Sequence, residues 1–308
     1  MKVSLITTVK DSANHIGEFL GSLAAQTRTP DEIIVVDGGS TDGTIDLLRD
    51  AGGITLIEQP GANIARGRNL AIGAASHDII AVSDADCILE PDWLEKLLEP
   101  LEAGADVSMG FFLPITEGFL QDCMAAVNLP TAVSEIDPAT FMPSARSVAY
   151  RRDAIERVGG YPEWLAIGED MWVNHRWREQ HLDMRFAPDA VAHWRLRPTL
   201  VATWKQYFKY ARGDAQAGMH PERHALRFGV YAGAVAALTS RRRLPRVAGA
   251  AGAVAYARGP VTRAWRRMND PRERALATVV VPGLMAWIDT AKMAGYAAGL
   301  VDRAAKRG

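Results

Sequence analysis

Two carboxylates separated by one residue follow a short apolar run in the first third of the chain. The run Ile79–Val82 leads directly into Ser83-Asp84-Ala85-Asp86-Cys87. Such a pair can bind a hard divalent cation that also contacts diphosphate oxygens, since Mg²⁺ and Mn²⁺ take few protein carboxylates and rely on substrate phosphates for the rest. Asp84 and Asp86 are therefore candidate metal ligands, although an Asp-x-Asp pair alone is a frequent coincidence.

A second polar segment, VVDGGSTDGT at Val35–Thr44, follows another apolar run. An Asp at the end of a buried strand, followed by a Gly-rich turn into a helix, suits a nucleotide site at a sheet edge. Asp37 could accept a hydrogen bond from a ribose hydroxyl or a base N–H. The alternative is an ordinary strand–helix turn with Ser40 or Asp42 as a helix cap, and this segment alone does not decide between the two.

Alternating strands and helices are expected to place these carboxylates. The β-rich apolar runs predict strands at Val3–Val9, Ile33–Val36, Ile54–Ile57, Ile79–Val82 and Val107–Gly110. Helical periodicity predicts helices at Ala13–Gln26, Thr44–Asp50, Ile64–Ala75 and Pro91–Glu102. Strands regularly separated by helices indicate right-handed βαβ units, and so an α/β fold with a doubly wound, mostly parallel, Rossmann-like sheet.

The pattern becomes irregular from Ile115 to Thr199. It predicts strands at Ser147–Arg151, Arg185–Ala187 and Val191–Trp194, and helices at Glu169–Gln180 and Thr199–Ala211. After about Leu226 the composition changes to Ala, Gly, Val and Arg. We therefore expect an α/β domain over residues 1–213 and a basic, Ala/Gly-rich helical region over residues 214–308.

Charge is distributed very unevenly along the chain. Residues 1–199 hold 16 Lys and Arg against 30 Asp and Glu, whereas residues 200–308 hold 19 against 6. The basic part has few Phe and Tyr in binding-type clusters, which argues against nucleic acid as a partner.

Only two cysteines occur, so a disulfide framework is excluded and a reducing compartment is expected. The N-terminus is predicted to be the first strand and not a signal peptide.

The basic region contains three small-residue apolar segments. Two are shorter than the roughly 20 residues that span a bilayer. The third is long enough but contains Pro282, Asp289 and Lys292. Interfacial helices on an anionic membrane are the favoured interpretation, with a spanning final segment possible and a packed helical subdomain as the alternative. The arginines that flank these segments are Arg241, Arg242, Arg243, Arg246, Arg258, Arg263, Arg266 and Arg267.

The order of the segments VSLITTVKD, VVDGGSTDGT, ARGRN, VSDADC and GED resembles that of the family-2 glycosyltransferases, which have the GT-A fold. The resemblance covers roughly Lys2 to Gly213. It implies an inverting transfer in which an acceptor hydroxyl displaces a nucleoside diphosphate, with UDP favoured, and a Mn²⁺ or Mg²⁺ cofactor.

The resemblance assigns roles to individual residues. Asp37 matches the base- and ribose-binding acid, and Asp84 and Asp86 match the metal-binding Asp-x-Asp pair, Asp86 being the more direct ligand. The positions that match nucleotide-contacting segments of the family are Thr8, Val9, Lys10, Arg68 and Asn69. This chain departs from the family after strand one, where Pro-Thr-Tyr-Asn is replaced by Thr8-Val9-Lys10-Asp11, and at Gly38, which replaces a second acid.

Asp170 of Gly168-Glu169-Asp170 matches the catalytic base of the family. A sugar hydroxyl is a poor nucleophile at neutral pH, so a carboxylate within hydrogen-bond reach must accept its proton. Asp170, with Glu169 beside it, opens a predicted helix whose macrodipole favours an ionised acid. The alternative for both residues is simple helix capping.

Further candidates rest on position alone. His193 lies where several relatives place an additional metal ligand, against the alternative of a half-buried structural histidine. Lys209 and Arg212 could neutralise the departing diphosphate or form a solvated basic helix face. The histidines without such positional support are predicted to lie on the surface, namely His175, His181, His220 and His224. Tyr161, Trp164 and Trp172 flank the proposed base and could pack against a sugar ring, although core packing is the more common role.

The sequence therefore predicts a glycosyltransferase that is cytoplasmic and peripherally attached to the inner face of the cell membrane. Its acceptor is expected to be a cell-envelope glycan or a lipid-linked molecule. The alternatives are a sugar nucleotidyltransferase, which would normally show a Gly-rich loop after strand one that Thr7–Asn14 lacks, and an inactive membrane-bound scaffold of the same fold.

Overall fold

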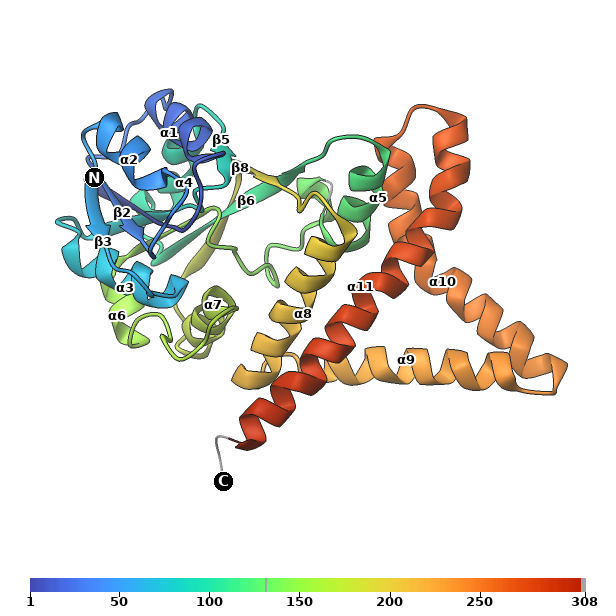
Figure 1. The fold of residues 1–308 in the computed structure, drawn as a ribbon. Coiled ribbons are helices and arrows are strands. Elements are labelled where there is room, and N and C mark those ends of the chain that lie inside the picture. Colours follow the sequence, from blue (N-terminus) through green and yellow to red (C-terminus); the bar gives the residue numbers. More distant parts are fainter. Residues whose placement is uncertain (131, 306–308) are drawn as a thin grey trace. The chain divides into compact units, whose positions relative to one another are not determined.

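The computed structural model describes residues 1–130 and 132–305, and these form two compact units. The first unit comprises Met1–Ile115 and Ala132–Arg195. The second holds the segment that begins at Thr116 and the chain from Leu196 onward. Figure 1 shows the elements of both units.

The first unit is an α/β domain. Its strands are β1 (Val3–Val9), β2 (Glu32–Asp37), β3 (Thr55–Glu58), β4 (Ile79–Val82), β5 (Cys87–Leu89), β6 (Val107–Ile115), β7 (Val148–Arg151) and β8 (Met184–Arg195). Its α-helices are α1 (Ile16–Ala24), α2 (Thr44–Ala51), α3 (Ile64–Ala74), α4 (Trp93–Glu102), α6 (Arg152–Arg157) and α7 (Glu169–Glu179), with a 3₁₀ turn at Val133–Glu135.

All eight strands form one mixed sheet in the order β3-β2-β1-β4-β7-β6-β8-β5. Strands β3, β2, β1 and β4 are mutually parallel, as the alternation of strands and helices predicted. Strand β7 is antiparallel to both β4 and β6, and β5 is antiparallel to β8. The doubly wound, GT-A-like architecture is confirmed, with these antiparallel strands added to it.

The register of the parallel strands aligns the ends of β1 and β2, whereas β4 ends three residues before the end of β1. Val9 at the end of β1 lies opposite Asp37 at the end of β2, and Val82 at the end of β4 pairs with Ile6. Each of these strands is buried because helices cover both faces of the sheet: Figure 1 shows α1, α2 and α4 on one side and α3, α6 and α7 on the other. The loops after β1, β2 and β4 therefore emerge at one edge of the sheet.

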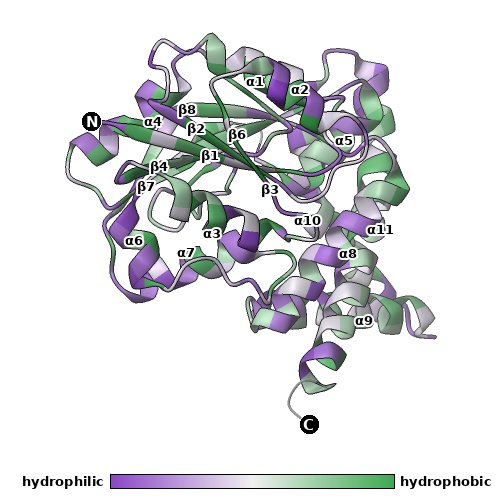
Figure 2. Ribbon diagram, turned by 60° about the vertical axis from the view of Figure 1, so that its left-hand side comes forward, coloured by the Kyte–Doolittle hydropathy of each residue, from purple (hydrophilic) through white to green (hydrophobic). Residues whose placement is uncertain are grey.

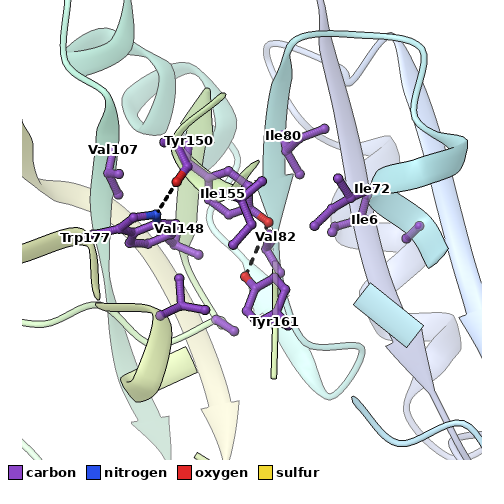
Figure 3. Close-up of a cluster of buried hydrophobic side chains, with 14 of the residues drawn as sticks. Ile6, Ile72, Ile80, Val82, Val107, Val148, Tyr150, Ile155, Tyr161 and Trp177 are labelled. Carbon is purple, nitrogen blue, oxygen red and sulfur yellow. Dashed lines mark hydrogen bonds between the residues drawn. The ribbon is translucent and has the colours of Figure 1, made fainter. Parts of the chain in front are cut away.

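Apolar side chains from the strands and from α6 and α7 form the core beneath this edge. Figure 2 shows the strands of this unit as mainly hydrophobic ribbons, and Figure 3 shows Val148 and Ile155 packed around three aromatic rings. These are Tyr150, Tyr161 and Trp177, all at most 3% exposed. The hydroxyls of Tyr150 and Tyr161 lie 3.3 Å apart and satisfy each other. This core fixes the start of α7, where Asp170 lies.

The second unit is wholly helical. It contains α5 (Phe119–Asn128), α8 (Leu200–Ala217), α9 (Pro221–Thr239), α10 (Arg243–Arg267) and α11 (Pro271–Ala305). Helices α8 and α11 pack with little space between their backbones, since a Cβ at Gly295 would lie 2.1 Å from the carbonyl oxygen of Phe208, and one at Gly299 would lie 2.3 Å from that of Arg212.

The predicted domain boundary after Gly213 falls inside α8 and differs from the division in the structure. Helix α8 belongs with the helical unit because its backbone at Phe208 and Arg212 packs on Gly295 and Gly299 of α11. The region around Phe119–Asn128 also joins this unit and was not predicted as a helix. His224 was predicted to lie on the surface, and this was wrong: it is buried, stacks on Tyr296 and bonds to Asp214 at 3.0 Å.

Among the described residues, one helix is long and apolar enough to cross a membrane, namely α11. Of its most apolar window, 39% is buried inside the structure. Asp289 of this helix is itself buried and accepts hydrogen bonds from Arg227, Tyr231 and Tyr256. The segment of α11 around Asp289 therefore packs inside the second unit.

Candidate active site

Two loops at the carboxyl edge of the sheet are joined by hydrogen bonds. Ser40 Oγ accepts from the backbone N–H of Asp11 at 2.8 Å, and Asp11 Oδ1 accepts from the N–H of Thr41 at 2.9 Å. Asp42 Oδ2 accepts from the N–H of Ala13 at 2.9 Å. The loop after β1, which carries Lys10, is thereby held against the loop after β2.

Asp37 is fully buried within its own turn. Its Oδ1 accepts from the N–H groups of Gly39 and Ser40 at 2.8 and 2.9 Å, and its Oδ2 accepts from the Ser40 hydroxyl. Gly39 adopts a φ of +97°, a backbone conformation that would be strained in a residue with a side chain. The carboxylate therefore shapes the turn, which is the structural alternative considered from the sequence.

Arg68 on α3 links two of the predicted carboxylate groups. Its Nη2 donates to Asp84 Oδ1 at 3.0 Å and its Nη1 donates to Glu169 Oε1 at 2.5 Å. Helix α3 can approach β1 closely because residue 67 is glycine: a Cβ there would lie 2.7 Å from Thr8 Cγ2. The close approach places the buried guanidinium between the end of β4 and the start of α7.

Electrostatics strengthen this cluster. Burial alone would lower the pKa of Arg68, but the attraction of Glu169 and Asp84 outweighs it and raises the pKa above its ordinary value. Burial raises the pKa of Glu169, Arg68 opposes this, and the nearby charge of Asp170 raises it further. A permanently charged Arg68 therefore balances several carboxylates drawn from distant parts of the sequence.

Asp170 lies in the first turn of α7, after Gly168 in the left-handed conformation. Its Oδ1 accepts from the N–H of Met171 at 2.8 Å, and its Oδ2 accepts weakly from the N–H of Ala145 at 3.4 Å. The side chain is half-buried, whereas Glu169 beside it is buried. Of the two adjacent acids, Asp170 is the one that retains exposure to solvent.

Arg146 was missed by reasoning from the sequence and lies next to the Asp-x-Asp pair. Its Nε is 3.9 Å from Asp84 Oδ2, and its guanidinium lies 4.0 Å from the ring centre of Trp194. Trp194 Nε1 in turn donates to Asp86 Oδ2 at 3.2 Å. Ala145, the residue before Arg146, contacts Asp170. Ala145 and Arg146 together therefore connect Asp170 to the Asp84–Asp86 segment. Arg146 precedes an expected strand, and nothing else in the sequence distinguishes it.

Asn69 organises the segment that leads into α7. Its amide donates to the carbonyl oxygen of Tyr161 at 2.9 Å and to Glu163 at 3.0 Å, and it accepts from the N–H of Tyr161. Tyr161 and Trp172 contribute to the core, as most aromatic residues at such spacing do. Trp164 is 53% exposed, Trp172 is half-buried and Tyr161 is buried.

His193 is not brought together with the Asp-x-Asp pair. On β8 it lies opposite Ile88, while its neighbour Trp194 lies opposite Cys87, so the two side chains point to opposite faces of the sheet. His193 Nε2 bonds to Glu90 at 2.5 Å. In the described parts of the chain, no group of three His, Cys, Asp or Glu side chains could hold a metal ion.

The two carboxylates nevertheless suit a hard cation that takes most of its ligands from substrate and water. Asp84 is paired with two guanidinium groups, from Arg68 and Arg146, and Asp86 accepts a hydrogen bond from Trp194. The donor set fits Mg²⁺ or Mn²⁺ bound with a diphosphate, and does not resemble a closed structural metal site.

Lys209 and Arg212 lie on α8 in the helical unit. Lys209 is exposed, whereas Arg212 Nε pairs with Asp302 of α11 at 2.6 Å.

A hollow of about 310 Å³ lies at the amino ends of β1 and β4, away from the edge that carries the site, where Lys2, His77 and Arg151 line it. It contains none of the predicted site residues.

Comparisons with known proteins bear on the family and the fold. Residues 4–159 match the model of the family described as glycosyl transferase family 2. The chain is 28% identical to the glycosyltransferase AglE of Haloferax volcanii over 235 residues, 70% of this chain and 74% of that one. It is 26% identical to the O-antigen chain rhamnosyltransferase RfbN of Salmonella typhimurium over 225 residues, 68% and 71% of the two chains.

Two solved structures show the same fold. The mannosyltransferase PcManGT of Pyrobaculum calidifontis, solved with GDP-Man and Mn²⁺, superposes with a TM-score of 0.58 at 19% identity, covering 100% of this chain and 88% of that one. TarS 1–349 of S. aureus, solved with UDP, gives 0.51 at 15% identity, with 99% and 92% covered. The family match spans half of the sequence, and the chain accordingly belongs to glycosyl transferase family 2 and is a glycosyltransferase of the GT-A fold.

Proposed function

We propose that the enzyme moves a sugar from a nucleoside diphosphate donor, with UDP favoured, to an acceptor hydroxyl with inversion at the anomeric carbon. The observation that carries the proposal is the convergence of Asp84, Glu169 and Asp170 around Arg68. These acids come from two segments about 85 positions apart in the sequence, and a purely structural helix cap would need none of the upstream partners.

In the proposed reaction, Asp170 accepts the proton of the acceptor hydroxyl. The acceptor oxygen forms a bond to the anomeric carbon while the bond from that carbon to the phosphate oxygen breaks, and the nucleoside diphosphate leaves with the electron pair. Asp170 suits this role because it keeps solvent exposure while two N–H groups orient it. Glu169 is a positioning residue, since its pairing with Arg68 fixes the first turn of α7.

On the donor side, we assign Asp86 to the metal ion, which would neutralise charge on the diphosphate when bound. Asp84 and Arg68 would orient the nucleotide, with Asn69 and the segment Thr8–Lys10 shaping its surroundings. Asp37 acts through the turn that it holds. Lys209 is kept as a proposed diphosphate contact, whereas Arg212 is engaged by Asp302 and His193 by Glu90.

The similar proteins support donor and acceptor classes without fixing either. One structural neighbour was solved with GDP-Man and Mn²⁺ and the other with UDP, so nucleoside diphosphates and a divalent cation are reasonable for this fold. The similarity to an O-antigen rhamnosyltransferase favours a cell-envelope glycan or lipid-linked acceptor. We further propose that the basic helical unit attaches the enzyme to anionic lipid at the cytoplasmic face of the membrane.

A donor screen tests the proposal. Thermal unfolding would be followed with UDP-, GDP- and dTDP-sugars, each with Mn²⁺ or Mg²⁺, and slow hydrolysis of the stabilising donor would then be measured. We expect one nucleotide class to raise the unfolding temperature only with metal, and to be hydrolysed. A nucleotidyltransferase would instead form the sugar nucleotide from a sugar phosphate and a nucleoside triphosphate, and an inactive scaffold would do neither.

A further inference from the structure

Helices α9 and α10 expose an unusual amount of apolar surface. Only His224 is buried on α9, and only Val261 and Ala264 are buried on α10, among the described residues. The large apolar side chains that these two helices expose are Leu226, Phe228, Val230, Val235, Leu238, Leu244, Val247, Val254, Tyr256 and Trp265. Leu238 and Leu244, on either side of the turn that joins the helices, are 69% and 79% exposed.

The turn between these helices is strongly basic. Figure 1 shows α9 and α10 meeting at this turn, which contains Arg241 and Arg242 and leads into Arg243. The sequence between Glu222 and Asp270 contains ten arginines and no Asp, Glu or Lys. An apolar surface with this charge is complementary to an anionic surface, and it would repel a second copy of itself.

Arginines lie at both ends of each apolar stretch. The charge-free part of α9 runs from Phe228 to Thr239, and that of α10 runs from Val247 to Ala257. At 1.5 Å per residue the two stretches are about 16 to 18 Å long, which is too short for a hydrocarbon core of about 30 Å. An upright insertion would place the arginines of the turn near the bilayer centre, where charge is costly. Helices lying in the plane of the membrane let both sets of arginines reach lipid phosphates.

A polar cluster around the buried carboxylate of Asp289 holds both helices to α11. Asp289 of α11 accepts from Arg227 at 2.8 Å and Tyr231 at 3.1 Å on α9, and from Tyr256 at 2.8 Å on α10. Helices α9 and α10 also pack closely on each other, since a Cβ on Gly249 of α10 would lie 2.6 Å from Ala237 Cβ of α9. The apolar surface is therefore presented by fixed helices.

We infer that α9 and α10 form the membrane-binding surface of this enzyme, lying along the headgroup layer of an anionic leaflet with their apolar side chains among the acyl chains. The inference rests on the membrane attachment proposed above and is independent of the transfer chemistry. Helix α11, with Asp289 and many other buried residues, serves as the support and does not cross the bilayer.

Flotation of the full chain with lipid vesicles tests this inference. We expect the protein to float with mixed phosphatidylcholine–phosphatidylglycerol vesicles, to float less in high salt, and to remain largely unbound with phosphatidylcholine alone. The triple variant R241Q/R242Q/R243Q should bind anionic vesicles on the order of a hundredfold more weakly, given the contribution of each arginine near such a surface. The matched control R49Q/R157Q/R185Q makes the same charge change at exposed positions of the catalytic unit.

A fluorescent probe locates the contact. Cys87 and Cys123 are buried, so an environment-sensitive dye will label Leu238→Cys selectively, or Leu47→Cys as an exposed control on the catalytic unit. Anionic vesicles should shift the emission of the dye at position 238 to the blue and leave that at position 47 unchanged. Equal shifts at both positions, equal binding of the two triple variants, or a vesicle-independent dimer crosslinked through position 238 would overturn the inference. Donor hydrolysis, measured in parallel without lipid, reports separately on the proposed function.

Discussion

Arg68 donates a hydrogen bond to Asp84 at 3.0 Å and thereby ties helix α3 to the carboxyl end of β4. The same guanidinium holds Glu169 at the start of α7. One buried side chain thus fixes the distance between the Asp-x-Asp segment and the proposed base. This relation explains why a buried arginine belongs to the site.

Removing the guanidinium should be costly. Arg68→Met leaves Glu169 buried without its cation, and breaking a buried pair in this way costs about 3–5 kcal/mol of unfolding free energy. Arg68→Met combined with Glu169→Leu removes both charges and should recover much of that loss. Urea unfolding of the two variants measures this, with Arg157→Met, an exposed pair on α6, as the control. If Arg68→Met alone were as stable as the wild type, the pair of Arg68 and Glu169 would contribute nothing to stability.

The glycine before Arg68 should be replaceable only together with Thr8. A Cβ in Gly67→Ala would lie 2.7 Å from Thr8 Cγ2, and overpacking of this kind costs about 1–3 kcal/mol. Thr8→Ser removes the clashing methyl group but keeps the hydroxyl, so the double variant should regain most of the stability. Thermal unfolding of the four proteins gives the coupling energy. Additive effects of the two substitutions would contradict the contact.

Asp86 should govern the metal dependence. Asp86→Asn keeps the shape of the side chain but removes its charge, so the Mn²⁺ concentration needed for half-maximal donor binding should rise at least several-fold. The exposed residue Asp46 on α2 provides the matched control, Asp46→Asn. The readout is a Mn²⁺ titration at fixed donor concentration. Identical titrations for Asp86→Asn and wild type would remove Asp86 from the metal site.

Lys292 should make stability depend on pH in the alkaline range. Burial lowers its pKa to about 8, while an unfolded lysine titrates near 10.4. Between these values the unfolded state binds more protons, so the free energy of unfolding should rise with pH by up to about 1.4 kcal/mol per pH unit. Below pH 8 both states are protonated and this dependence vanishes.

Comparison with Lys292→Gln isolates that effect. Glutamine keeps an N–H donor for Asn128, which now accepts from Lys292 Nζ at 2.5 Å. Unfolding of both proteins would be followed from pH 7 to pH 9.5, where the wild type should gain stability relative to the variant. Parallel curves would show that Lys292 titrates normally in the folded protein.

Much of the catalytic fold could be predicted from local patterns. Strands β1 and β4 were predicted with their observed bounds, because each is a short run of apolar, largely β-branched residues. Strand β8 was predicted as two strands because Pro188 and Asp189 interrupt its pattern, yet the sheet continues through them beside a register shift at Met109/Phe111. The antiparallel placement of β7 depends on pairing across distant sequence and has no local signal.

Part of the candidate site could also be predicted from local sequence patterns. Asp84 and Asp170 stand directly after a strand and at a helix start, where the sequence pattern indicates their position. Arg146 and the pairing of Arg68 with Glu169 arise from contacts between segments far apart, which spacing alone does not reveal. His193 had positional support only, and the alternation of side chains along β8 turns it toward Glu90.

The proton-accepting role of Asp170 is tested most directly by Asp170→Asn, compared with wild type and with Asp46→Asn. Donor binding and metal-dependent donor hydrolysis would both be measured on each protein. The account predicts that Asp170→Asn binds the donor nearly as tightly as wild type but shows no detectable hydrolysis. Persistent hydrolysis together with lost donor binding would contradict it.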